Sequence, residues 1–282
     1  MDKVLNSDEE QFWSGPSGQS WVTFEAEQDA LLSEVLDAVL QRAGLKSGDA
    51  VMDIGCGTGA LSVAAAGIIG EGGRGLAADI SGPMLARAAE RLRHAPWFST
   101  QLADAEAADW SGAGFDAAIS RFGVMFFGNP PRAFANIAKA LRPGGRMTFA
   151  TWAPVARNPY WRDPARIASA RLGEVPKGEP NSPGPMGMAD VDWSIRQLRA
   201  AGLADVACEE VTVHLPIEAS PQKAAELVLV IGPAARVVRL YQASPEDAAA
   251  IRDDIARDLE QYQDGNAVRI PALLNLYTAR VV

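Results

Sequence analysis

Three closely spaced glycines are the residues most suited to holding a small ligand. Gly55, Gly57 and Gly59 follow an apolar run over 50–54, and Cys56 lies between the first two. Glycine permits positive backbone φ angles and leaves no Cβ between the backbone and a ligand. A helix that follows such a loop aims its free N–H groups at the same place. The spacing therefore predicts a strand, a ligand-binding loop and a helix, in that order.

The acidic residue before these glycines distinguishes between two kinds of ligand. With Ala60, the glycines also fit the dinucleotide pattern G-x-G-x-x-G/A, which is weakly specific on its own. A pyrophosphate lies over such a loop because the N–H groups and the helix dipole favour anions. The carboxylate of Asp53 would repel that anion. S-adenosylmethionine carries an ammonium and a sulfonium there, and Asp53 would accept a hydrogen bond from the ammonium or orient the loop. The alternative is that Asp53 only caps the glycine turn.

Two further aspartates follow predicted strands. Asp79 lies about 20 residues after Gly59, the spacing at which an acidic residue reaches ribose hydroxyls; alternatively it caps a helix that starts near Ser81. Asp104 follows the third predicted strand, where its carboxylate would accept from an adenine amino group, or would serve as a plain turn aspartate. The two positions predict a site for an unphosphorylated nucleoside.

Candidates for a general base are few, and the catalytic residues stay unidentified. His94 is expected at the surface, near a helix end, and His214 is expected on a strand far along the chain from the glycine loop. Arg121 follows the fourth predicted strand, where it would hold a substrate carboxylate or phenolate, or form a salt bridge with a neighbouring helix. His214 and Arg121 are the two weak catalytic candidates.

Aromatic and sulfur-containing side chains flank the expected mouth of the site. Apolar pockets for flat ligands are built from such residues, which favours a hydrophobic or aromatic small molecule as substrate. The alternative is that most of these side chains pack in the core and the cap. The candidate substrate-binding residues are Trp13, Trp21, Phe122, Met125, Phe126, Trp152 and Trp161.

The elements that position these residues alternate between strand and helix. This alternation predicts parallel βαβ units and a doubly wound, Rossmann-like α/β sheet. The predicted strands are 50–54, 75–79, 98–102, 115–120 and 146–151, and the predicted helices are 61–69, 84–92 and 131–141. Later in the chain, a helix is expected over 191–200, strands over 206–215 and 273–281, and polar helices over 221–262.

The segments around this core suggest helical caps and a lid. Residues 173–188 are rich in proline and glycine, as binding loops often are. The expected division is a helical cap over 1–45, a ligand-binding core over 46–152, a lid loop and helix over 153–204, and the last two strands over 205–282 with a helical insertion over 219–262.

Composition excludes several classes of protein. The formal net charge is −9 and basic residues are scattered, which argues against binding a nucleic-acid backbone. No apolar run approaches the roughly 20 residues of a membrane span, and the first ten residues do not resemble a signal peptide, so a cytoplasmic location is expected. Two cysteines, Cys56 and Cys208, are too few for a disulfide framework or a zinc cluster. No metal site is expected.

Four motifs together are highly specific, although singly only the first is: DIGCGTG (53–59), ADIS with PML (78–81 and 83–85), ADA (103–105) and LRPGG (141–145). On these motifs, residues from about 45 to 152 resemble a class I S-adenosylmethionine-dependent methyltransferase. Within that superfamily the chain is similar to the type 11 group, which includes quinone-biosynthesis C-methyltransferases. The motifs SRFGVMFF (120–127) and TW (151–152) strengthen the similarity to this subgroup.

The resemblance implies a cofactor, a product and a set of contacts. The cofactor is S-adenosyl-L-methionine, the product is S-adenosyl-L-homocysteine, and the sheet has seven strands with an antiparallel final hairpin. The implied contacts are Gly55, Gly57 and Gly59 along the methionine part, Asp79 on the ribose, Ile80 and Met84 against adenine, Asp104 and Ala105 at the adenine edge, and Ser120 and Arg121 near the reacting methyl group. The acceptor is expected to be a small, hydrophobic or aromatic molecule, with O- or C-methylation favoured.

Other activities are less consistent with the sequence. Methylation of an adenine or glutamine amide nitrogen usually needs Asn/Asp-Pro-Pro-aromatic after the fourth strand, whereas Arg132 follows Asn129 and its two prolines. An NAD-dependent oxidoreductase is a remote alternative because the chain has no Tyr-x-x-x-Lys and because Asp53 disfavours pyrophosphate. A protein that binds S-adenosylmethionine without methylating remains an alternative. The sequence does not predict an oligomeric state.

Overall fold

The computed structural model describes residues 6–176 and 178–282. Residues 1–5 lie outside these ranges, and they belong to the expected N-terminal cap and to the segment compared with signal peptides. Residue 177, in the expected lid loop, also lies outside them.

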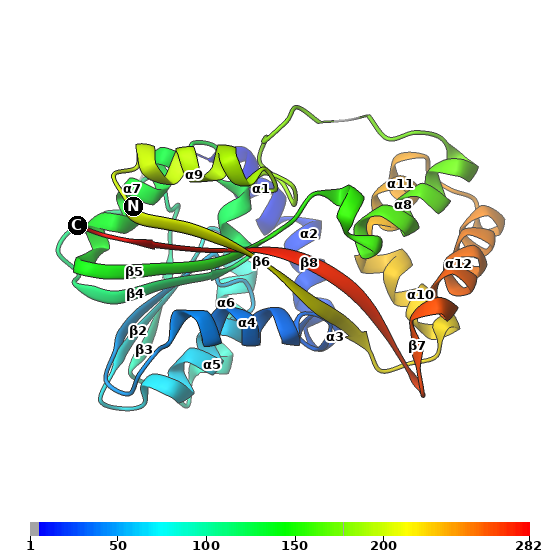
Figure 1. Ribbon diagram of the computed structural model, residues 1–282. Coiled ribbons are helices and arrows are strands. Elements are labelled where there is room, and N and C mark those ends of the chain that lie inside the picture. The colour runs from blue at the N-terminus through cyan, green and yellow to red at the C-terminus, as the bar shows by residue number, and fades with distance from the viewer. Residues whose placement is uncertain (1–5, 177) are drawn as a thin grey trace.

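A single mixed sheet forms the centre of the molecule (Figure 1). Its order is β3-β2-β1-β4-β5-β8-β6, with the short β7 paired to β8. All neighbours from β3 to β5 are parallel, and β8 runs antiparallel to both β5 and β6. The predicted α/β fold with an antiparallel final hairpin is therefore confirmed. The strands are β1 Ala50–Ile54, β2 Arg74–Asp79, β3 Phe98–Leu102, β4 Phe115–Arg121, β5 Leu141–Trp152, β6 Ala204–Ile217, β7 Gln263–Asp264 and β8 Ala267–Arg280.

The strand order fixes where a ligand can bind. From β1 the chain proceeds to β2 and β3 on one side of the sheet, and then to β4 and β5 on the other. In doubly wound sheets the connecting segments diverge at such a switch point and leave a crevice at the carboxyl ends of the strands. The glycine loop follows β1 directly, so it lies in this crevice.

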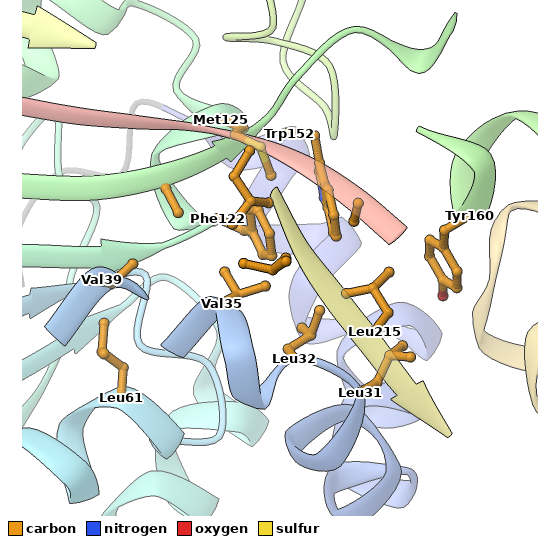
Figure 2. Packing of buried hydrophobic residues seen from close by; sticks show 14 of the residues in the cluster. Leu31, Leu32, Val35, Val39, Leu61, Phe122, Met125, Trp152, Tyr160 and Leu215 are labelled. Atoms are coloured by element: carbon orange, nitrogen blue, oxygen red, sulfur yellow. The ribbon is translucent and has the colours of Figure 1, made fainter. Parts of the chain in front are cut away.

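Helices cover both faces of the sheet. One apolar cluster receives side chains from three helices: Val35 and Val39 from the first, Leu61 from the second and Leu85 from the third. A second cluster contains Phe134 and Leu198, from two other helices. Figure 2 shows Leu32 and Val35 packed toward Phe122 in the first cluster. The helices of the first face are α4 Ser33–Ala43, α5 Ala60–Ile69 and α6 Gly82–Leu92, and those of the second are α7 Pro130–Ala140 and α9 Val191–Ala200.

Local sequence explains the ends of these helices. The side chains of Ser81, Asn129 and Asp190 accept a hydrogen bond from a backbone N–H of the first turn in α6, α7 and α9, respectively. Such caps stabilise a helix by about 1 kcal/mol. Helix α4 ends at Ala43 and is followed by Gly44, whose φ of 56° is left-handed, as is common for a glycine after a helix.

The core elements begin and end close to the predicted residues, with one clear difference. Strand β5 starts at Leu141 rather than at 146 because Leu141 pairs with Phe115 ahead of an irregularity in the register. Gly144, at φ 74°, lies in that irregular stretch. The two final strands are also longer than predicted, at 14 residues each.

The long β6 and β8 project beyond the core and carry a separate group of helices (Figure 1). Ile251 and Ile255 are fully buried there, and Val228 nearly so. These helices are α8 Pro159–Leu172, α10 Pro221–Ile231, α11 Pro233–Leu240 and α12 Pro245–Leu259. Residues 221–262 are thus helical as expected, while the division into domains remains a prediction. None of the helices in the described ranges is long and apolar enough to cross a membrane.

The N-terminal segment forms three short helices over the crevice. These are α1 Ser7–Ser14, α2 Pro16–Thr23 and α3 Glu25–Leu31. The sequence indicated a helical cap here but gave no boundaries for α1 or α2. Pro16 stands at the first position of α2, where its missing N–H costs nothing and its fixed φ suits a helix.

Candidate functional site

A deep pocket opens at the carboxyl ends of β1, β2 and β4, beneath α1 and α2. The empty space inside it and at its open mouth is about 1010 Å³. Most of the cofactor-binding residues predicted from the sequence line it: Asp53, Gly55, Cys56, Gly57, Asp79, Ile80, Met84, Asp104, Ala105 and Arg121.

Glycine is needed at the three positions of the loop for different structural reasons. All three have positive φ, between 57° and 88°. A Cβ on Gly55 would come within 2.7 Å of the Gly123 Cα, and one on Gly59 within 2.9 Å of the Ala88 Cβ. A Cβ on Gly57 would meet no atom within 4 Å. The outer glycines therefore allow close packing of β1 and α5 against their neighbours, and Gly57 leaves its face of the loop open for a ligand.

Asp53 is a buried carboxylate with one oxygen unused. Its Oδ2 accepts a hydrogen bond of 2.6 Å from the Ser62 hydroxyl in α5. Its Oδ1 is buried and has no hydrogen-bond partner among the described residues. Burial raises the pKa of Asp53 to about 7, although Ser62 and the charge of Arg121 oppose the rise. A buried carboxylate in this state is suited to receive a cationic donor.

Asp79 connects two loops at the pocket wall. Its Oδ2 accepts from the Gly57 N–H at 2.7 Å, and its Oδ1 accepts from the Ser81 N–H at 2.8 Å. Burial raises the pKa of Asp79, and these amides oppose the rise. The N-cap of α6 is Ser81 rather than Asp79. Each carboxylate oxygen has a further lone pair that can accept from a ribose hydroxyl.

Asp104 is held by the N-terminal segment. It accepts from the backbone N–H and the side-chain amide of Asn6, each at 3.0 Å, and from the Glu106 N–H at 2.9 Å. The Ser81 hydroxyl donates to the Trp13 carbonyl at 2.7 Å. These contacts place α1 directly over the adenine end of the expected site.

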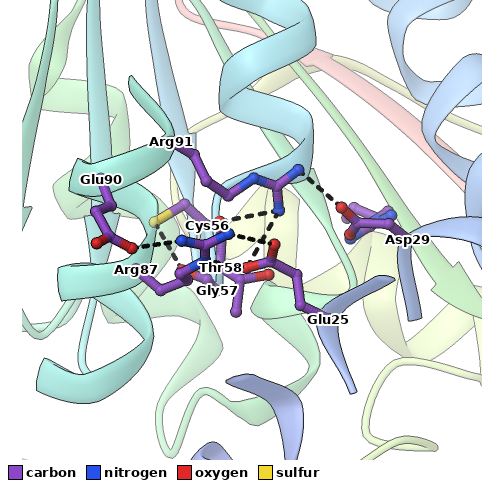
Figure 3. A network of polar contacts seen from close by, with 9 residues as sticks. Glu25, Asp29, Cys56, Gly57, Thr58, Arg87, Glu90 and Arg91 are labelled. Carbon is purple, nitrogen blue, oxygen red and sulfur yellow. Dashed lines mark hydrogen bonds and ion pairs between the residues drawn. The ribbon is translucent and has the colours of Figure 1, made fainter. Parts of the chain in front are cut away.

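A second set of polar contacts ties α3 to α6. Arg87 forms an ion pair with Glu25 at 2.7 Å, and Arg91 forms one with Asp29 at 2.7 Å (Figure 3). Arg91 also donates to the carbonyl of Thr58 in the glycine loop, at 3.2 Å. The N-terminal helices, the loop and α6 are therefore connected around the pocket.

The two residues expected near the reacting methyl group differ in whether they line the pocket. Ser120 donates its hydroxyl to the Ile54 carbonyl at 2.7 Å and does not line the pocket. The side chain of Arg121 lines it and is 9% exposed. Its contacts are long, at 3.4 Å to the Leu32 carbonyl and 3.8 Å to Asp29.

Aromatic rings form the upper wall of the pocket. Trp13 and Phe126 meet edge to face with ring centroids 4.9 Å apart, and Trp21 lies beside Trp13 at 6.4 Å. Phe122 and Phe127 also line the pocket. Phe122 has a φ of 69°, which is uncommon outside glycine and is found most often at functional sites.

The remaining predicted substrate-binding residues lie behind this wall. Trp152 stacks on Phe122 with centroids 4.2 Å apart, and Trp161 meets Trp152 edge to face at 5.7 Å. Met125 is buried in the same cluster. None of the three is among the residues that line the pocket, so their role in acceptor binding stays a prediction.

The candidate bases lie away from the site. His214 is half exposed on β6, at the edge of the sheet, with its Nδ1 3.7 Å from Glu34. Neither His214 nor His94 is among the lining residues. Sequence reasoning missed Glu9, which does line the pocket and whose pKa is raised by burial. Glu9 and Trp13 lie four residues apart in α1 and therefore share one of its faces, and Asn6 is the N-cap of the same helix. The spacing indicates this shared face but not the surface on which it docks.

In the described ranges, no group of three or more His, Cys, Asp or Glu side chains could hold a metal ion.

Comparisons with known proteins agree with the geometry of the pocket. Residues 51–145 match the model of a family described as a methyltransferase domain. An uncharacterized protein of Mycobacterium tuberculosis is 31% identical over 139 residues, which cover 48% of this chain and 50% of that protein. Nocamycin O-methyltransferase of Saccharothrix syringae is 28% identical over 257 residues, which cover 83% and 84% of the two chains.

One further likeness is in sequence, and another is in the fold. A ubiquinone/menaquinone biosynthesis C-methyltransferase of Klebsiella pneumoniae is 32% identical over 108 residues, 37% of this chain and 43% of that one. The fold is similar to phosphoethanolamine N-methyltransferase 2 of Haemonchus contortus in complex with S-adenosyl-L-methionine, with a TM-score of 0.51, 20% identity, and 88% and 52% of the chains covered. The chain spans about half the length of the first curated relatives it matches. The resemblance predicted from the motifs is confirmed.

Proposed function

We propose that this chain, whose residues 51–145 match the model of a methyltransferase domain, transfers the methyl group of S-adenosylmethionine to a small hydrophobic or aromatic molecule. The observation that carries the proposal is one pocket with two unlike walls. Its floor consists of the open Gly57 loop and the buried carboxylates of Asp53 and Asp79, and its upper wall is aromatic.

The residues of the floor fit the cofactor. The unpartnered Oδ1 of Asp53 suits its ammonium, and the open face beside Gly57 leaves room for its methionine part. Asp79 would accept from the ribose hydroxyls, and Ile80 and Met84, which line the same pocket, would contact adenine. When bound, the cofactor supplies a methyl group on a positively charged sulfur, which needs no further activation.

The protein then has to orient the acceptor and exclude water. Correct orientation alone can supply roughly 7–11 kcal/mol of the barrier. Trp13, Phe126 and Phe122 provide a flat apolar surface for this purpose. Since no histidine, lysine or tyrosine lines the described pocket, the proposed acceptors are acidic phenols, enols or quinols, which lose their proton without a strong base.

The atom that receives the methyl group is oxygen or carbon in this proposal. The names of two relatives support both choices, one being an O-methyltransferase and the other a C-methyltransferase. A phenolate or enolate presents both nucleophiles, and the angle at which the aromatic wall holds the acceptor would decide between them.

Binding and transfer are tested separately. Titration calorimetry with S-adenosylmethionine, S-adenosylhomocysteine and NAD is expected to show micromolar affinity for the first two and none for NAD. Incubation with trideuteromethyl-labelled cofactor and a panel of phenols, quinols and enolic polyketides is then analysed by mass spectrometry. A labelled product supports the proposal. Cofactor binding with no labelled product from any acceptor would favour the non-methylating alternative, and NAD binding alone would favour an oxidoreductase.

A further inference from the structure

Asp53 and Arg121 lie on the same face of the sheet, on neighbouring strands. In the parallel register of β1 and β4, Asp53 is opposite Ile119. Side chains two residues apart on a strand point to the same face, so Arg121 lies one step beyond Ile119, beside Asp53. Both side chains border the pocket. An acidic and a basic group thus stand next to each other where the glycine loop begins.

Arg121 is a buried cation with few close partners. Its guanidinium can donate five hydrogen bonds, yet among the described residues it donates one, of 3.4 Å, to the Leu32 carbonyl. The ion pair with Asp29 is 3.8 Å long, and the Asp29 Oδ1 is buried without a hydrogen bond in the described ranges. Buried charges are normally paired and hydrogen-bonded. Most donors of Arg121 and the Oδ1 of Asp53 thus have no hydrogen-bond partner in this part of the chain.

We propose that Arg121 binds the carboxylate of the cofactor's methionine part, while Asp53 accepts from the ammonium on the same carbon. This inference rests on the proposed function. It makes Arg121 a binding residue for the cofactor and not for the acceptor, and it gives Asp29 the role of holding the guanidinium from the side of α3.

The charges around Arg121 favour an amino acid over an anionic acceptor. Burial lowers the pKa of Arg121, and the charges of Asp29 and Asp53 oppose this lowering, so the guanidinium stands between two carboxylates. A lone phenolate or carboxylate from an acceptor would meet Arg121 but would also be repelled by both aspartates. An amino acid brings a positive group along with its carboxylate, so that each charge finds an opposite one and the amino acid part itself adds no net charge to the pocket.

The test compares ligands that differ only in the amino acid part. S-adenosylhomocysteine carries both charged groups, its decarboxylated analogue carries the ammonium alone, and 5′-methylthioadenosine carries neither. For Arg121→Gln, calorimetry is expected to show about a ten- to hundredfold loss of affinity for S-adenosylhomocysteine, the effect of losing a charged hydrogen bond. The affinities for the other two ligands should stay within about twofold of those of the unmodified protein.

Arg146→Gln is the matched control. It removes an arginine that pairs with Asp49 at 2.7 Å and does not line the pocket. The ratio of affinities for S-adenosylhomocysteine and 5′-methylthioadenosine should be unchanged in this variant. The inference is overturned if Arg121→Gln weakens all three ligands equally, as a purely structural residue would, or weakens none. If the unmodified protein binds none of the three, the proposed function itself fails, and the two failures are thereby distinguished.

Discussion

The backbone N–H of Gly57 donates to the carboxylate of Asp79 across 2.7 Å, so the last residue of β2 holds the loop that follows β1. Asp79 also accepts a hydrogen bond from the Ser81 N–H, which fixes the turn into α6. One side chain thus keeps the glycine loop and the start of α6 at a set separation, and the ribose of a nucleoside would lie between them.

Asp79→Ala should weaken binding of S-adenosylhomocysteine by more than about tenfold, because the variant loses both the loop anchor and an acceptor for ribose hydroxyls. Calorimetry measures this affinity. Asp116→Ala is the control, since Asp116 accepts from the Ala50 N–H at 2.8 Å, at the opposite end of β1. It should lower the free energy of unfolding and leave the affinity unchanged. Equal affinities for Asp79→Ala and the unmodified protein would contradict a role in binding.

The stability of the protein should depend on pH through Asp53. Burial raises the pKa of this carboxyl from 3.8 to about 7 in the folded state. The folded protein therefore binds a proton more tightly than the unfolded chain, so the contribution to stability is full below about pH 4 and is lost as the pH rises through 7. Each unit of pKa difference corresponds to about 1.4 kcal/mol.

Urea unfolding of the unmodified protein and of Asp53→Asn at several pH values measures this effect. The free energy of unfolding of the unmodified protein should fall relative to that of Asp53→Asn as the pH rises from about 4 to 7. A pH-independent difference would mean that Asp53 keeps its ordinary pKa in the folded protein.

Gly57→Ala should affect ligand binding more than stability. The new methyl group would point into open space, at the face of the loop that the ligand is proposed to cover. Gly48→Ala shares the positive φ, at 87°, and also meets no atom within 4 Å, but lies outside the pocket. Both variants should lose about 1 kcal/mol of stability from backbone strain, and only Gly57→Ala should lose affinity for S-adenosylhomocysteine. Equal affinities in the two variants would argue against ligand contact at Gly57.

Replacement of Trp13 and replacement of Trp152 should have different effects on stability and on acceptor binding. Trp152 is 4% exposed and stacks on Phe122, so Trp152→Ala should lower the free energy of unfolding by about 3–5 kcal/mol. Trp13 is only partly buried and lines the pocket, so Trp13→Ala should cost less stability and raise the KM for an apolar acceptor. Urea unfolding and steady-state kinetics measure the two quantities. A smaller loss of stability in Trp152→Ala than in Trp13→Ala would contradict this assignment of wall and core.

The sequence predicted the sheet and the floor of the pocket well because both are encoded locally. Strands that alternate with helices, a glycine cluster after the first strand and aspartates at the next two strand ends are all readable from neighbouring residues. The contributions of Asn6 and Glu9 depend on how α1 docks against Asp104 and Ser81. Such docking depends on contacts between distant parts of the chain, which spacing alone does not reveal.

The aromatic residues show the same limit. Phe122 and Trp152 are both large, apolar and close to the ends of neighbouring strands, and the sequence treats them alike. Phe122, which has a left-handed backbone, lines the pocket, whereas Trp152 stacks on its ring and does not.

The contacts of the N-terminal helices also set an order of assembly. Asn6 bonds to a residue 98 positions later, Trp13 to one 68 positions later, and Glu25 and Asp29 to arginines 62 positions later. On the ribosome this segment emerges before β2, α6 and the turn after β3, so it cannot make these contacts until they have been synthesised. We therefore expect it to dock only after the part of the sheet that it covers has formed.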